Sequence, residues 1–195
     1  DVGGAGPQLE PGTLNTEGEH DRSAALVFEV DPSRLADPLL RAPSYRLVCG
    51  QTWQGLPQVA LYGRVKAMVE HWRPRHVVVD ATGLGAGLAA FLEKAFPGRI
   101  TPFVFSAASK SRLGWDFLSA VETGRFKVFR AAEGHPLRDV LWREFANCSY
   151  AIGAGPGQAL RWGVRPGGDR HDDLVVAAAL VVVLDDLPWP FPGGA

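Results

Sequence analysis

The stretch from Arg75 to Phe91, RHVVVDATGLGAGLAAF, constrains the fold of this chain more than any other. Its first half is a continuous apolar, β-branched run that ends at Asp80, and such a run is typical of a strand covered on both faces. Its second half has the glycines of a turn and then the apolar spacing of a helix. A covered strand that leads directly into a helix indicates an α/β protein, in which helices pack against a sheet.

The remaining patterns extend this interpretation along the chain. Two segments near the start predict antiparallel neighbours, and strand and helix patterns then alternate. The predicted strands are 24–30, 45–51, 76–80, 101–105 and 126–129, with a β-hairpin at 149–152 and 159–164, and the predicted helices are 57–72, 84–96, 113–122, 136–145 and 172–186. Counting a strand that would end at or near Asp1, we predict a mixed α/β sheet, antiparallel in its first three strands and then parallel, flanked by helices and extended by the hairpin.

Composition sets limits on the organisation and on the partners. The 195 residues are 46% hydrophobic, which is enough for one domain of ordinary size. We assign residues 1–187 to this domain and the Pro- and Gly-rich residues 188–195 to a tail. No apolar run reaches the ~20 residues that span a bilayer, so no membrane partner is expected. Lys and Arg total 20 against 21 Asp and Glu, so contact with nucleic acid would depend on local basic patches.

The glycines after Asp80 match neither of two nucleotide-binding motifs. A dinucleotide fingerprint would need a glycine at Leu88, and a phosphate-binding loop would continue into Gly-Lys-Ser or Gly-Lys-Thr. A tight turn explains the glycines sterically, but it does not explain Asp80. This residue ends a strand at the carboxyl edge of the sheet, where open α/β sheets carry their sites. It is either a cap on the following helix or a functional carboxylate.

Further acids also occur where the sequence predicts the end of a strand or the start of a helix. Asp1 would end the first strand, before a long Gly- and Pro-rich loop at residues 3–20, and Asp172 and Asp173 begin the most apolar helix. Acids also favour helix N-termini through the helix dipole alone. Together, however, carboxylates so placed can converge at one sheet edge and hold two Mg²⁺ or Mn²⁺ ions, ~3.5–4 Å apart, for attack on a phosphodiester. Such hard cations prefer oxygen ligands and offset the repulsion between clustered carboxylates.

Three segments carry a resemblance to a known family: DVGG…EHDRSAALVFEVD, VVVDATGLGAGL and RHDDLVVAAALVV. In this order they resemble the nuclease domain of the large terminase subunit of tailed bacteriophages, which has an RNase H-like fold. The resemblance implies that Asp1, Asp80, Asp172 and Asp173 are the catalytic and metal-binding residues, with two Mg²⁺ or Mn²⁺ ions as cofactors. It implies an endonuclease that cuts concatemeric double-stranded phage DNA, leaving a 3′-hydroxyl and a 5′-phosphate, in the host cytoplasm at the procapsid portal.

The resemblance also implies partners. In family proteins an ATPase motor domain precedes the nuclease, and because no Walker motif is present here we expect this chain to be the part that follows the motor. The portal and the small terminase subunit are further expected partners. Two alternatives stay open: a Holliday-junction resolvase or transposase-like nuclease, which uses similar carboxylates on a differently shaped substrate, and a non-catalytic DNA clamp or portal-docking module.

Basic residues in the segments that flank the acids are candidates for DNA contact. Solvated surface is the common alternative for such side chains, and for a histidine in a helix-entry turn as well. The candidates are Lys110, Arg112, Arg143, Arg161, Arg165, Arg170 and His171.

Overall fold

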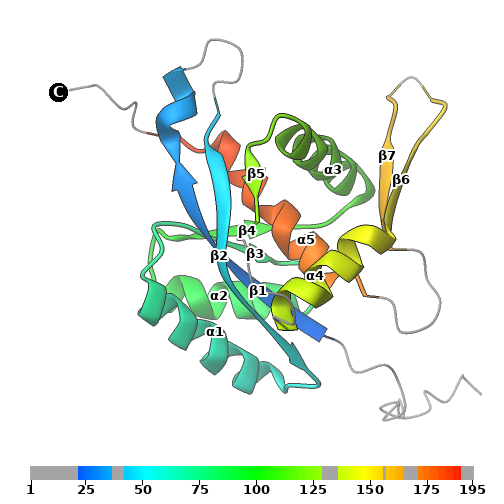
Figure 1. Cartoon of the computed structure of the whole chain (residues 1–195). Coiled ribbons are helices and arrows are strands. Elements are labelled where there is room, and N and C mark those ends of the chain that lie inside the picture. Colours follow the sequence, from blue (N-terminus) through cyan, green and yellow to red (C-terminus); the bar gives the residue numbers. More distant parts are fainter. Residues whose placement is uncertain (1–21, 37–41, 129–135, 156, 165–170, 190–195) are drawn as a thin grey trace, which may run out of the picture.

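A computed structural model of the chain describes residues 22–36, 42–128, 136–155, 157–164 and 171–189. The strands are β1 (Arg22–Asp31), β2 (Ser44–Gln54), β3 (Val77–Asp80), β4 (Ile100–Phe103), β5 (Phe126–Lys127), β6 (Cys148–Ile152) and β7 (Leu160–Val164). The helices are α1 (Gln58–Trp72), α2 (Gly85–Ala95), α3 (Ala107–Glu122), α4 (Pro136–Asn147) and α5 (Asp173–Ala179), with 3₁₀-helices η1 (Pro32–Ala36) and η2 (Leu180–Asp186). The predicted α/β class and the order of its elements are confirmed (Figure 1).

The strands pair as an antiparallel part and a parallel part. β1 and β2 are antiparallel, with an irregularity in register between Val27 and Phe28, and β5 runs parallel to β2. β3 and β4 are parallel, with Asp80 opposite Phe103, and β6 and β7 form the predicted hairpin. Within the described residues, β1 and β3 each pair along one edge only. The first strand predicted at Asp1 and the loop predicted at residues 3–20 lie outside the described part of the chain.

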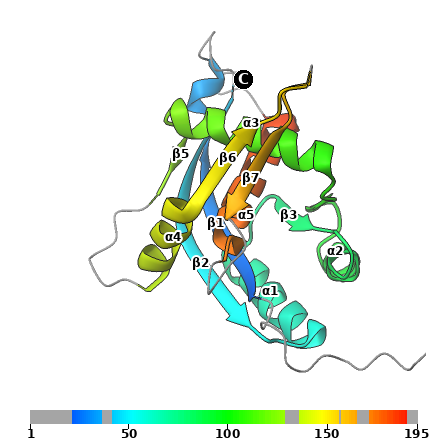
Figure 2. The same cartoon turned by 90° about the vertical axis from the view of Figure 1, so that its right-hand side faces the viewer.

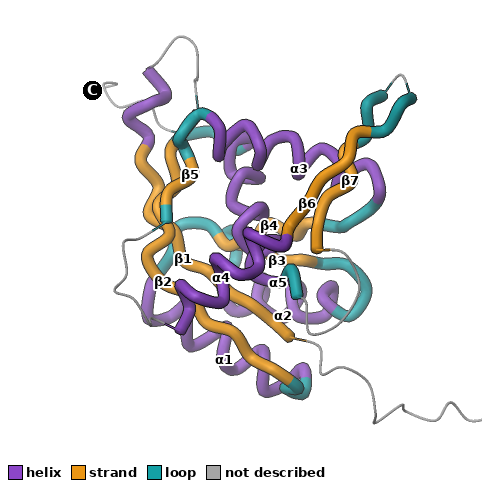
Figure 3. The backbone as a smooth tube through the Cα atoms, turned by 45° about the vertical axis from the view of Figure 1, so that its right-hand side comes forward, coloured by secondary structure: helices purple, strands orange, loops and turns teal. Residues whose placement is uncertain are grey.

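The core lies where helices meet the strands. A large cluster of buried apolar residues joins α3, α5 and η2 to Tyr45 of β2. A second cluster, of Leu47, Leu141 and Leu174, packs α4 and α5 against β2. α1 and α2 lie beside each other and cover β3, as Figure 3 shows. None of the helices in the described ranges is long and apolar enough to cross a bilayer.

The last predicted helix differs from the structure in its second half. An α-helix was predicted over residues 172–186, whereas α5 ends at Ala179 and the chain continues as the 3₁₀-helix η2. Three successive valines fall in η2, and β-branched side chains lose rotamer freedom against the preceding turn of an α-helix. The tighter winding of η2 ends at a partly buried ionic cluster, in which Arg125 binds both carboxylate oxygens of Asp185 at 3.0 and 2.9 Å.

The start of α3 also differs from the prediction. The helix begins at Ala107, not at Leu113, because Ser106 caps it. The Ser106 hydroxyl accepts from the Ser109 amide at 3.1 Å, and the Ser109 hydroxyl accepts from the Ser106 amide at 2.7 Å. This reciprocal arrangement is a capping box, but a serine holds the place that Glu or Gln usually takes. The usual sequence signal for the helix start is therefore missing.

The hairpin β6–β7 packs against α3 (Figure 2), and the close contact is at Gly114. A Cβ atom at Gly114 would lie 2.3 Å from the Cδ1 and Nε1 atoms of Trp162 and 2.8 Å from Cδ2 of Leu160. Trp162 is held in this position because its Nε1 donates to the Lys110 carbonyl oxygen at 2.7 Å. A glycine is therefore needed at this position for the hairpin to approach α3.

Gly114→Ala is expected to lower the free energy of unfolding by about 1–3 kcal/mol, the usual cost of inserting a methyl group into a packed interface. Urea unfolding measures the effect. The matched control is Gly87→Ala in α2, where an added methyl meets no described residue within 4 Å and should stabilise the helix by up to about 1 kcal/mol. Equal effects of the two substitutions would contradict the close packing of the hairpin.

Candidate metal centre

Asp80 lies at the carboxyl end of β3, and its side chain is exposed. Oδ1 accepts a hydrogen bond from the Thr82 amide at 2.8 Å, which closes the turn between β3 and α2. The helix itself has Leu84 at its N-cap and no side-chain cap. Asp80 therefore stabilises the turn but does not cap α2, and its Oδ2 accepts no hydrogen bond from the described residues.

The turn after Asp80 is tight because of Gly85. A Cβ atom at Gly85 would lie only 2.2 Å from the carbonyl oxygen of Asp80. The glycine thus allows α2 to start directly beside the end of β3, and this explains the glycine-rich sequence sterically. The carboxylate remains at the surface at the edge of the parallel strands, where open α/β sheets carry their sites.

Asp172 is the second carboxylate available for a ligand. It is the N-cap residue of α5, yet its side chain makes no cap hydrogen bond. The half-buried carboxylate instead faces β7, where Oδ2 lies 2.8 Å from the position that a Cβ atom of Gly163 would take. The Lys110 ammonium lies 3.7 Å from the same position. Gly163 has a φ of 138°, a conformation that side chains rarely adopt, so a glycine suits both the backbone and the close carboxylate.

The start of α3 contacts the surroundings of both carboxylates. On one side, the Phe105 amide donates to the Thr82 hydroxyl at 2.8 Å, which ties the chain before α3 to the Asp80 turn. On the other side, Lys110 in the early part of α3 reaches toward Asp172, and its ammonium lies 5.3 Å from the centre of the Trp162 ring. The capped start of α3 therefore links the two acidic positions and places a cation beside one of them.

Asp173, the neighbour of Asp172, has different surroundings. Its Oδ2 accepts from Arg22 Nε at 3.1 Å, and His171 Nδ1 lies 3.6 Å from the same oxygen. Burial raises the pKa of the Asp173 carboxyl above its usual value, and the Arg22 guanidinium opposes this shift. Successive residues at a helix start point about 100° apart, and here one of the two acids faces β7 while the other is held in an ion pair with β1.

The other predicted site residues lie on several different elements or outside the described part of the chain. Arg112 pairs with Asp116 at 3.5 Å and with Asp186 at 2.9 Å, at the end of η2. Arg161 is exposed on β7 and Arg143 is exposed on α4. Asp1, Arg165 and Arg170 lie outside the described residues. Within the described ranges, no three His, Cys, Asp or Glu side chains form a group that could hold a metal ion.

Two residues near the acids were missed by the sequence analysis. Glu144 of α4 is 4% exposed and accepts hydrogen bonds from the first turn of α5. Arg22 of β1 forms ion pairs with both Glu144 and Asp173. The segment around Glu144 reads as an ordinary helix, and no local signal indicates that its glutamate is buried.

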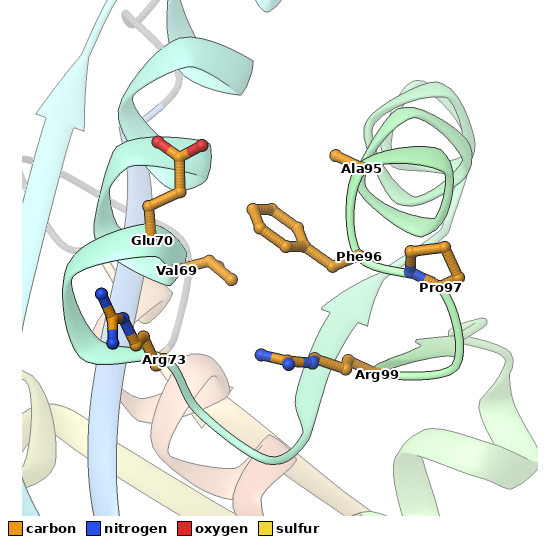
Figure 4. Close-up of a pocket in the computed structure, with 7 residues that line it drawn as sticks. All are labelled: Val69, Glu70, Arg73, Ala95, Phe96, Pro97 and Arg99. Atoms are coloured by element: carbon orange, nitrogen blue, oxygen red, sulfur yellow. The ribbon is translucent and has the colours of Figure 1, made fainter.

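A pocket of about 470 Å³ lies elsewhere, between the C-terminal ends of α1 and α2. Figure 4 shows Val69, Glu70 and Arg73 on one side and Phe96 and Arg99 on the other. The Val77 amide donates to the Arg99 carbonyl oxygen at 2.8 Å, so Arg99 lies at the amino end of β3 whereas Asp80 lies at its carboxyl end. The pocket is therefore separate from the candidate metal centre.

The class that these observations define is an α/β domain with an exposed carboxylate, Asp80, at the carboxyl edge of its parallel strands and a half-buried one, Asp172, at the start of α5. The family is the terminase RNaseH-like domain: residues 41–183 match it, and the chain belongs to this family. The large terminase nuclease from thermophilic phage G20c with bound cobalt has a similar structure, with a TM-score of 0.56 and 19% identity over 85% of this chain and 84% of that chain. The same nuclease with bound magnesium has a TM-score of 0.55 and 20% identity over 84% and 81% of the two chains. These likenesses confirm the RNase H-like fold.

One curated relative is much longer than its match to this chain. The probable terminase, ATPase subunit of Haemophilus phage HP1 is 25% identical over 93 residues. The match covers 48% of this chain and 15% of that relative.

Proposed function

We propose that this domain is a divalent-metal-dependent DNA endonuclease of a phage packaging terminase, which cuts concatemeric viral DNA by two-metal phosphodiester hydrolysis. The observation that carries the proposal is the pair of carboxylates Asp80 and Asp172, which have oxygens that no cation or amide of the described residues engages and which lie on elements linked by the start of α3. The family membership and the metal-bound G20c structures of the same fold support it.

The donor set fits a hard divalent cation. Asp80 and Asp172 would hold it through oxygens, the ligand type that Mg²⁺ and Mn²⁺ prefer, with Asp1 as a third carboxylate. When bound, the ions would supply Lewis acidity at the scissile phosphodiester. Of the two adjacent acids we assign Asp172 as the primary ligand and Asp173 as a residue that supports it, because Asp173 already pairs with Arg22.

Lys110 is suited to contact the DNA. Its position beside Asp172 and over the Trp162 ring places a positive charge at the edge of the acidic site, where a backbone phosphate would approach. Arg161 is exposed on β7 of the same hairpin, and His171 precedes the acid pair. In this proposal the hairpin forms one side of the DNA-binding surface and Arg112 is a further contact, while Arg165 and Arg170, which lie outside the described residues, stay candidates from the sequence alone.

The proposal extends to the whole packaging protein. An ATPase motor domain would precede this domain, and the portal and the small terminase subunit would be its partners in the host cytoplasm. The relative from phage HP1, which is much longer than its match to this chain, supports a larger assembly.

A plasmid-nicking assay tests the activity. We expect nicking with Mn²⁺ at least as fast as with Mg²⁺, because a crowded carboxylate site penalises Mg²⁺, which demands a near-ideal octahedron. Excess EDTA should abolish cleavage, and cleavage that persists in EDTA would contradict the proposal. DNA binding with no nicking in either metal would instead favour a non-catalytic clamp, and strong preference for a four-way junction would favour a resolvase.

A further inference from the structure

The first turn of α5 is capped by a residue from another helix. Glu144 Oε2 accepts hydrogen bonds from the Leu174 amide at 2.8 Å and from the Val175 amide at 3.4 Å. These are the second and third residues of the turn that follows Asp172. Backbone amides at a helix start have no partner within the helix, and here a buried carboxylate of α4 satisfies two of them.

An aspartate at an N-cap would normally do this itself. Its carboxylate usually accepts from the amides two and three residues later, and Asp172 occupies that position in the sequence. Because Glu144 already binds these amides, Asp172 makes no cap hydrogen bond. Its Oδ2 lies against β7 at Gly163 instead, on the side where the Lys110 ammonium lies.

Arg22 holds Glu144 in place. The other oxygen of Glu144 pairs with Arg22 Nη2, while Arg22 Nε donates to Asp173 at 3.1 Å. The side chains of Arg22 and Glu144 are 15% and 5% exposed. Charges buried to this extent are stable only when they are paired, so the ion pairs of Arg22 join β1, α4 and α5 at this point.

We propose that Glu144 is a positioning residue: it caps α5 in place of Asp172 and thereby keeps the Asp172 carboxylate available to the metal. The inference rests on the proposed function, because it assigns a ligand role to Asp172. Without Glu144, the amides of Leu174 and Val175 would compete for the Asp172 carboxylate. The carboxylate would then turn from the site toward its own helix.

The effect of Glu144 on Mn²⁺ affinity can be measured directly by calorimetric titration of the protein with Mn²⁺ in the absence of DNA. Glu144→Ala is expected to weaken Mn²⁺ binding about 10- to 100-fold, the range typical of residues that orient metal ligands. Glu144→Gln retains an oxygen that can accept from both amides and is expected to bind Mn²⁺ within about threefold of the unaltered protein. Rescue by glutamine would show that the cap, and not the negative charge of Glu144, is required.

The control separates positioning from general loss of packing. Leu141→Ala removes a fully buried side chain from the same helix α4, in the cluster that contains Leu174. It should lower the Tm and leave the Mn²⁺ affinity of the folded protein unchanged. In an Asp172→Asn background, Glu144→Ala should change Mn²⁺ affinity less than about twofold, because Glu144 acts through Asp172.

The outcomes distinguish this inference from the proposed function. If the unaltered protein binds Mn²⁺ and Glu144→Ala binds it equally well, the positioning role is wrong while the metal centre stands. Absence of Mn²⁺ binding to the unaltered protein would overturn both. If Glu144→Ala does not fold, Glu144→Asp serves the same purpose, because its shorter side chain withdraws the oxygen from the amides and keeps the charge.

Discussion

Asp80→Asn is expected to lower plasmid nicking by at least about 100-fold, since a metal ligand contributes several kcal/mol to stabilising charge at the reacting phosphate. The fold should persist, because the asparagine carbonyl can still accept from the Thr82 amide. The Tm without metal should be unchanged or higher, since the neutral amide removes repulsion between carboxylates. The increase in Tm on adding Mn²⁺ should shrink, because less binding free energy is linked to folding.

The same variant decides between the two interpretations of Asp80. A residue that only closed the turn would be replaced well by asparagine, whose side-chain oxygen can also accept from the amide two residues later, and both nicking and the Mn²⁺ effect would then persist. Asp139→Asn, at an exposed position of α4 with no proposed role, is the matched control and should cut like the unaltered protein. Near-normal cutting by Asp80→Asn would remove Asp80 from the proposed metal centre.

Arg125→Met should produce the largest loss of stability, about 3–5 kcal/mol in the free energy of unfolding. Arg125 is 5% exposed and binds the Pro43 carbonyl oxygen at 2.9 Å as well as both oxygens of Asp185. The Tyr45 hydroxyl donates to the same carboxylate at 2.5 Å, and burial, followed by the hydrogen bond to Asp185, raises the Tyr45 pKa. Removing the guanidinium leaves the partly buried Asp185 carboxylate without its counter-charge.

The control for Arg125 is the same substitution at an exposed ion pair. Arg112 pairs with Asp186, the residue after Asp185, but its side chain is 68% exposed. Arg112→Met should therefore change the free energy of unfolding by about 0–1 kcal/mol. Urea unfolding compares the two, and Arg125→Met with Asp185→Leu should recover part of the loss, since both buried charges are then removed. Similar losses for Arg112→Met and Arg125→Met would contradict the role of burial.

Patterns within a single element predicted the fold well. The β-branched run before Asp80 identified β3, and the turn and the helix α2 that follow β3 were predicted in the right order. The antiparallel pairing of β1 and β2 and the hairpin β6–β7 were also confirmed. These features depend on side-chain periodicity and turn residues, which are local properties of the chain. The start of α3 was missed because Ser106 begins an unusual capping box. The end of α5 was missed although the β-branched valines of η2 disfavour an α-helix.

The sequence by itself determined the class of fold and the acidic positions, because a strand end and a helix start can both be recognised from neighbouring residues. Only the tertiary structure decided what each acid does. Asp172 and Asp173 are adjacent and chemically identical, yet one faces β7 and Lys110 while the other pairs with Arg22. Glu144, 28 positions before Asp172 in the chain, binds the amides that Asp172 would otherwise cap. Whether Asp172 caps its own helix depends on which distant side chain reaches the helix start, and no periodicity in the sequence indicates such a contact.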